Sequence, residues 1–378
     1  MSDNTFELVE EALRTGGSQA GFDFLARRFR EEKNYPLLFE ARLMNNRHKL
    51  GLPLIYSEPA GDLSDDVRSV YEQGFTEAAR EAGGLFLADG DIPRAWSYFR
   101  AVGESAPVAA AIEKLEATEG MEAIIEIAFH ERVNPRKGFE LILSNYGVCR
   151  AITTFQQYPS REGRQECLRV LVERLYGELV ESLRHSITRR EGSTPETRAV
   201  AGLIAGRDWL FEDNCYYVDT THVVSVLQFS LESTDRETLG RAWELAEYGQ
   251  RLAPMFHYRG EPPFQNIFAD HAAYLRVLLG EDVEASLAHF RQKLAESDPN
   301  QAGEAPAQVL VGLLARLGRH EEAIEVSLAH LRDLNPSQLA CPSAVQLCQQ
   351  AGHFTRLKEL AREQGDLLSF AAAALQME

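Results

Sequence analysis

The side chains best suited to chemistry gather between residues 214 and 271. Carboxylates and imidazoles bind divalent metals and transfer protons. The candidates in this stretch are Asp219, His222, His257, Glu261, Asp270 and His271. We therefore expect a functional site here.

Asp219 and His222 form the most regular pair in this stretch. The sequence DTTH that contains them opens an apolar run, residues 223–231, which is typical of a helix. Positions i and i+3 share one helix face, so a carboxylate and an imidazole there can hold one ion. In the alternative interpretation, Asp219 is the N-cap and accepts a hydrogen bond from a backbone N–H, while His222 packs or faces solvent.

Other residues complete the predicted site. Either His257 or His271 would be the third metal ligand, and Glu126 or His130, four residues apart, would be a further ligand or a general base. Arg259 lies in the aromatic, proline-rich segment 254–268 and would bind an anionic group. The predicted cofactor is a divalent metal such as Zn, Mn, Fe or Ni, and the same segment could instead only pad a seam between two helical parts.

Carboxylate–histidine spacing is weak evidence when it stands alone. The 378 residues include 57 Asp and Glu. By chance, roughly half of the histidines would then have an acidic residue three or four positions away. What favours a site is position, since several of these histidines lie beside loops in the non-repeating middle of the chain.

Composition and charge exclude several classes of function. The net charge of −18 repels phosphate backbones and anionic membranes, so we expect neither nucleic acid nor a membrane as a partner. The N-terminal segment is acidic and unlike a signal peptide, and the five cysteines show no C-x-x-C spacing, which predicts a cytoplasmic protein with reduced thiols. Glycine-rich phosphate loops and the motifs HExxH and GxSxG are absent from the sequence.

The rest of the chain has the pattern of helical hairpins. Apolar residues recur at helical spacing, and a turn glycine is followed five residues later by a small alanine in three places. The pairs are Gly90 and Ala95, Gly280 and Ala285, and Gly318 and Ala323. Gly318 follows Gly280 by 38 residues and Gly352 follows Gly318 by 34, which is a helix-pair repeat length.

These features resemble the tetratricopeptide repeat (TPR) family, over residues 85–105 and 270–362. Phe99 occupies the family's aromatic position in the first unit, whereas His289 and Ser327 stand there in later units, and Pro336 falls one place beyond the terminal proline. The resemblance implies a right-handed stack of antiparallel helix pairs and names no binding partner. Short turns between amphipathic helices favour the same arrangement.

The sequence thus predicts an all-α, TPR-like superhelix, a helical solenoid with an irregular middle. We expect hairpins over residues 1–118, the irregular segment over 119–268 and further repeats over 269–378, with loop 51–61 and an extended run at 209–217. Two functions fit. One is a metal-dependent enzyme that hydrolyses, eliminates from or isomerises a small polar substrate. The other is a non-catalytic scaffold that binds a protein or peptide on its concave face.

Overall fold

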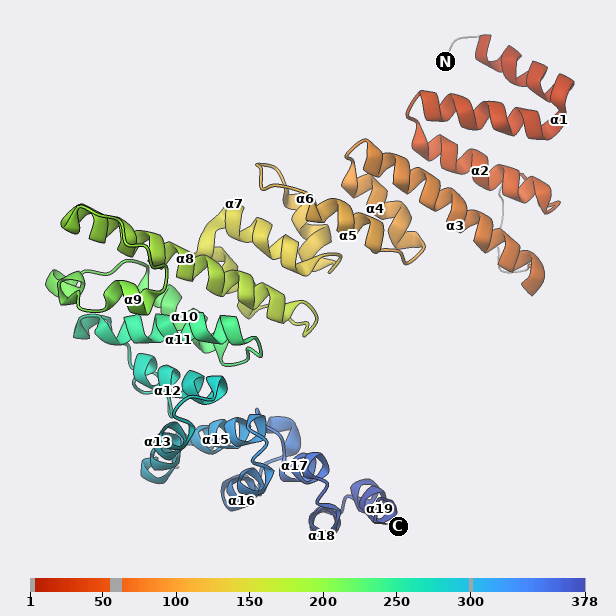
Figure 1. Cartoon of the computed structure of the whole chain (residues 1–378). Helices are drawn as coiled ribbons and strands as arrows, with labels where there is room; N and C mark the ends of the chain where they lie inside the picture. The colour runs from red at the N-terminus through yellow and green to blue at the C-terminus, as the bar shows by residue number, and fades with distance from the viewer. Residues whose placement is uncertain (1–3, 55–62, 299–301, 378) are drawn as a thin grey trace. The chain divides into compact units, whose positions relative to one another are not determined.

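The computed structural model describes residues 4–54, 63–298 and 302–377, which form α-helices joined by short turns (Figure 1). The all-α prediction is confirmed. Within these residues there is no strand, only one isolated antiparallel bridge between Arg259 and Asn266. The chain divides into two compact units, Met1–Gly147 and Val148–Glu378.

Turn and capping residues mark the ends of the first helices in the first unit. Gly17 leaves the helical conformation (φ 70, ψ −171) and breaks the first helix in two, and the side chain of Asn34 caps the second by accepting a hydrogen bond from the Leu37 N–H. Part of the predicted loop, residues 55–61, lies outside the described residues. The helices are α1 (Asn4–Glu31), α2 (Tyr35–Lys49), α3 (Asp65–Ala88), α4 (Ile92–Ala101) and α5 (Ala106–Glu113).

The predicted hairpin around Gly90 is formed by α3 and α4. Gly90 has the left-handed conformation that ends a helix (φ 82), and Ala95 is fully buried at the crossing. Gly83 allows a second close approach, because a Cβ there would lie 2.7 Å from the Phe99 ring. Both small residues therefore set the distance between the two helices.

The end of the first unit differs from the prediction. A short α-helix, α6 (Glu122–Ile125), continues as a π-helical turn, η2 (Glu126–His130), inside the segment that was predicted to be irregular. The next helix, α7 (Pro135–Gln156), is broken at Gly147 (φ 78, ψ 176). A Cβ at Gly138 would meet the Phe129 nitrogen at 2.8 Å, so only glycine permits this crossing.

The second unit is a longer series of helices, most of which contact their neighbours in the sequence, while α9 packs against α8 and α11. Its regular helices after α7 are α8 (Arg164–Glu191), α9 (Val200–Ile204), α10 (Thr220–Ser230), α11 (Arg236–Arg251), α12 (Ile267–Leu279), α13 (Val283–Glu296), α15 (Ala305–Arg316), α16 (His320–His330), α17 (Ala344–Ala351), α18 (Phe354–Gln364) and α19 (Leu367–Leu375). In the described ranges, none of the helices combines the length and the apolar character that crossing a bilayer requires.

The predicted extended run 209–217 is wrong over most of its length. Residues 209–214 belong to a 3-10 helix, η3 (Asp208–Asn214), which ends with positive φ at Asp213 and Asn214, whereas Cys215 directly after it is extended. The helix before it, α9, begins only at Val200, because the Thr197 hydroxyl accepts the Ala199 N–H and competes with helical hydrogen bonding.

The C-terminal hairpins confirm the predicted turn glycines. In one hairpin, the register of the second helix differs from the prediction. Gly280, Gly318 and Gly352 all have positive φ, and Ala323 is fully buried as predicted. Ala285 is exposed, however, and Ser286 is buried in its place. The turn after Gly280 contains one more residue, Asp282 (φ 46), so α13 starts a residue later than in the other hairpins.

A further hairpin, beyond the predicted repeats, joins α18 to α19. Gly365 has positive φ (71), and the Asp366 side chain caps α19 by accepting hydrogen bonds from the Leu368 and Ser369 N–H groups. The turn has the same design as the others. The series of hairpins therefore extends past residue 362, where the sequence resemblance ends.

Candidate functional site

Asp219 is the N-cap of α10. Its Oδ1 accepts a hydrogen bond from the Thr221 backbone N–H at 2.9 Å and another from the Thr221 hydroxyl at 2.6 Å. The hydroxyl bond, helped by the backbone bond and by His222, holds the pKa of Asp219 below its ordinary value. His222 is half-buried one turn along the helix. The capping alternative thus describes the local structure of Asp219.

His271 is buried inside the second unit, with 1% of its surface exposed. Its Nδ1 donates to the Ile267 carbonyl at 2.7 Å, and its ring lies 4.4 Å from that of Phe264, centroid to centroid. Burial lowers its pKa to about 4, so the ring is neutral at pH 7. Its Nε2 is buried without a hydrogen-bond partner among the described residues.

The other predicted residues of the segment 254–271 are His257, Arg259 and Glu261, and each makes a different local contact. His257 is exposed, and its ring packs edge-on against Phe268 with centroids 5.7 Å apart. Arg259 is exposed and forms the isolated bridge to Asn266. Glu261 accepts the Phe264 N–H with its backbone carbonyl, which closes a tight turn. These contacts shape the loop itself.

Glu126 and His130 belong to the first unit, at the two ends of η2. Both are exposed, and the His130 ring packs edge-on against Phe129 at 5.2 Å between centroids. Within the ranges 4–54, 63–298 and 302–377, no three or more His, Cys, Asp or Glu side chains group in a way that could hold a metal ion. The metal site therefore stays a prediction.

Asp270 is the center of a polar cluster that sequence reasoning missed. Asn266 is the N-cap of α12, and Asp270, in the first turn of that helix, is 1% exposed. Its Oδ1 accepts from His289 Nε2 at 2.8 Å, and its Oδ2 accepts from Lys293 Nζ at 2.7 Å and from the Asn266 N–H at 2.8 Å. The cluster fixes the loop before α12 onto α13. The available signal was the pair His289 and Lys293, four residues apart on α13.

A pocket of about 550 Å³ opens on the second unit. Each of three successive hairpins contributes the first of its two helices: Tyr274 comes from α12, Gly312 and Arg316 from α15, and Gln350 from α17. Tyr274 and Gly312 both stand six residues before their turn glycines. The missing side chain at Gly312 leaves room in the pocket. The remaining lining residues are Arg164, Gln228, Phe229, Leu231, Glu232, Ala315, Ala340, Cys341 and Pro342.

Hydrogen bonds and a ring contact fix the two arginine side chains of the pocket. Arg316 donates to the carbonyls of Leu231 and Ser233. The Arg164 guanidinium lies 4.2 Å from the Phe155 ring centroid, and its Nε donates to Glu232 Oε1 at 2.8 Å. Two arginines against one glutamate give the pocket a local positive charge in a chain of net charge −18.

The thiol in the pocket is poorly suited to nucleophilic chemistry. Burial raises the pKa of Cys341 to about 11, so its thiolate is scarce at neutral pH. Burial also raises the pKa of Tyr274, which keeps its phenol neutral. The pocket thus combines fixed cations, neutral hydrogen-bonding groups and apolar walls, which suits binding more than covalent catalysis.

Comparisons with protein-family profiles, with curated proteins and with solved structures find no match for this chain.

Proposed function

We propose that this protein is a non-catalytic, TPR-like binding scaffold, and that the pocket of the second unit holds a peptide of a partner protein. One observation carries the proposal: the pocket is lined by the first helices of three consecutive hairpins. In a superhelix of hairpins, equivalent helices line one continuous face, which extended ligands can follow. A TPR-like stack would present this face as its concave surface.

The chemistry of the lining indicates the kind of peptide. The Arg316 guanidinium has more N–H donors than the carbonyls of Leu231 and Ser233 use, so it can also bind a carboxylate. Apolar walls at Phe229 and Pro342 suit an aliphatic or aromatic side chain. The occupant is therefore an extended peptide with an acidic residue, or its own C-terminal carboxylate, next to an apolar residue.

Gly312 offers a way to fill the pocket without disturbing the fold. A Cβ at this position would meet only the Cβ of Cys341, at 3.8 Å, which is ordinary contact. A longer side chain, as in Gly312→Leu, would extend into the space that the peptide needs. Gly240→Leu is the matched control, because Gly240 is also helical and a Cβ there meets nothing within 4 Å.

The test uses a displayed library of random linear peptides, selected on the full chain. We expect the enriched peptides to pair an acidic with an apolar residue. Gly312→Leu should weaken the tightest peptide by about tenfold or more, as when a central contact is blocked, while Gly240→Leu should bind it like the wild type. Equal binding to Gly312→Leu and wild type, or selection of no peptide, would refute the proposal.

A further inference from the structure

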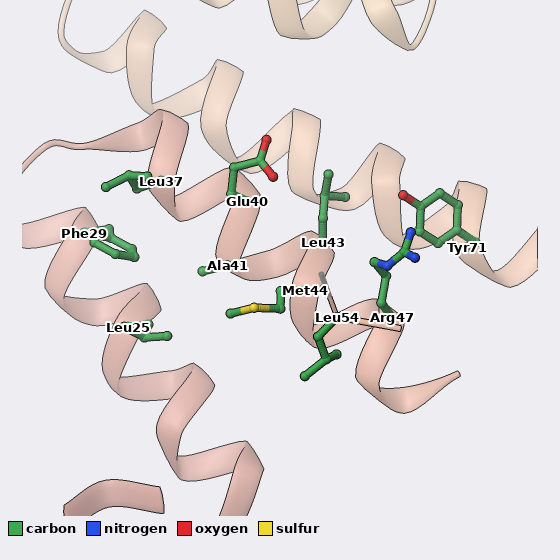
Figure 2. Close-up of a pocket in the computed structure, with 10 residues that line it drawn as sticks. All are labelled: Leu25, Phe29, Leu37, Glu40, Ala41, Leu43, Met44, Arg47, Leu54 and Tyr71. Carbon is green, nitrogen blue, oxygen red and sulfur yellow. The ribbon is translucent and has the colours of Figure 1, made fainter. Parts of the chain in front are cut away.

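The first unit has an open groove that the proposed function does not use (Figure 2). The groove has a volume of about 520 Å³ and runs between α1 and α2. Leu25 and Phe29 of α1 form one wall, and Leu37, Ala41 and Met44 of α2 form the other (Figure 2). It lies wholly within the first unit and is separate in sequence from the peptide pocket.

The apolar side chains in this groove have the spacing of helix recognition. Leu37, Ala41 and Met44 are at positions i, i+4 and i+7 of α2, so they form one stripe along its surface. Leu25 and Phe29 are four residues apart on α1 and face the same space. Two parallel stripes make a furrow of the kind that receives the apolar face of an amphipathic helix.

Two charged side chains also line the groove. Glu40 and Arg47 both line it and are two helical turns apart on α2, roughly 10 Å. Glu40 is exposed and forms no hydrogen bond or ion pair with any residue of the described ranges. The Nε of Arg47 donates to the Pro53 carbonyl at 2.6 Å, which holds the guanidinium in place.

We propose that this groove binds an amphipathic helix of a partner protein in one fixed direction. The partner helix has Leu, Ile or Phe at i, i+4 and i+7, a Lys or Arg opposite Glu40, and an Asp or Glu two turns away opposite Arg47. Opposite charges two turns apart favour one orientation and penalise the reverse. A partner less acidic than this chain is favoured over a second copy, because two chains of net charge −18 repel each other.

The probe is a displayed library of alanine-based helical peptides with randomised positions on one face, selected on the full chain. We expect apolar residues at helical spacing, with a basic residue at one end of the stripe and an acidic one at the other. Met44→Glu places a charge between the apolar walls and should weaken the best peptide by about tenfold. Gly312→Leu should leave this binding unchanged, which separates the groove from the peptide pocket.

A charge exchange tests the direction of binding. Glu40→Lys should weaken the best peptide by about threefold to fivefold, and exchanging the peptide's own basic residue for Glu should restore the affinity. Glu10→Lys is the matched control, since Glu10 is exposed on α1 outside the groove and the net charge changes equally. Failure of the exchanged peptide to restore binding, or selected peptides without the apolar stripe, would overturn the proposal. A wild-type dimer that Met44→Glu converts to monomer would assign the groove to a second copy instead.

Discussion

The regular hairpins and the irregular segment between α11 and α12 use their side chains in opposite ways. The irregular segment and the first turn of α12 contain several of the predicted site residues, and two of these, Asp270 and His271, are buried and hydrogen-bonded within the fold. The pocket and the groove are lined mainly by helices of the hairpins. A position outside the repeats is therefore a poor guide to where pockets open on this fold.

The backbone explains the difference. A helix satisfies its own N–H and C=O groups, so its outward side chains are available for recognition. An irregular loop must find partners for its backbone elsewhere. Here the Asn266 N–H donates to the Asp270 carboxylate and the Gly260 N–H to the Gln265 carbonyl. A Cβ at Gly260 would lie 2.3 Å from the Phe264 carbonyl oxygen, which shows how tightly this loop is folded.

The largest expected effect comes from removing the carboxylate that the irregular segment depends on. Asp270→Ala removes a buried carboxylate, so the Asn266 N–H loses its acceptor, and the Lys293 ammonium keeps the Gln265 amide oxygen but loses its counter-charge. Breaking a buried pair from one side costs about 3–4 kcal/mol of unfolding free energy, measured by urea denaturation. Glu40→Ala, in the groove of the hairpins, should change it by less than about 0.5 kcal/mol. Similar values for both variants would remove the distinction between the two regions.

The second effect is a loss of stability in mild acid through His271. Its pKa is about 4 in the folded protein, against about 6.5 in an unfolded chain. Between these pH values the unfolded state binds the proton and the folded state does not, so the unfolding free energy falls as pH decreases from 6.5 to 4. The loss should amount to about 2–3 kcal/mol. It is complete near pH 4, and above pH 6.5 this contribution is fully present.

Replacing the imidazole separates this effect from the rest of the acid response. His271→Leu keeps an apolar side chain beside Phe264 but cannot titrate, so its unfolding free energy should depend less on pH across this range. Carboxylates with a lowered pKa, such as Asp235, contribute equally to both proteins. An identical pH dependence in the variant and the wild type would contradict the neutral, buried state of His271.

The third effect compares two alanines of the hairpins. Ala323 is fully buried at the crossing of α15 and α16, so Ala323→Leu should overpack it and cost about 1–3 kcal/mol. Ala285 is exposed, and Ala285→Leu should change the unfolding free energy by less than about 0.5 kcal/mol. Thermal unfolding of both variants checks the register. A large loss of unfolding free energy in Ala285→Leu would instead support the register predicted from the sequence, in which Ala285 lies at the helix crossing.

Much of the fold followed from the sequence because its signals are local. Turn glycines and caps mark helix ends, so the breaks at Gly17 and Gly90 were predictable. The register of α13 was not, because the extra residue Asp282 leaves the glycine spacing unchanged. The pairing of Asp270 with Lys293 joins residues 23 positions apart, and no local pattern indicates it. From the sequence alone, Gly312 indicates only a residue that weakens a helix. In the structure it provides space in a pocket.

The smallest expected effect concerns Asp219 and the metal hypothesis. As an N-cap, Asp219 uses its oxygen as a hydrogen-bond acceptor, and an Asn side chain can do the same. Asp219→Asn should therefore change the unfolding free energy by less than about 0.5 kcal/mol.

A metal ligand would behave differently, because losing the anionic charge weakens metal binding, and with it the stability that a bound ion adds. Elemental analysis of protein purified without a metal-affinity tag, on wild type, Asp219→Asn and His222→Ala, decides between the two roles. Near-stoichiometric Zn, Mn, Fe or Ni that both substitutions remove would establish a metal site at α10, and the non-catalytic proposal would then give way to the enzyme. Unchanged metal content and stability in both variants would leave Asp219 as a cap, its charge serving the start of the helix alone.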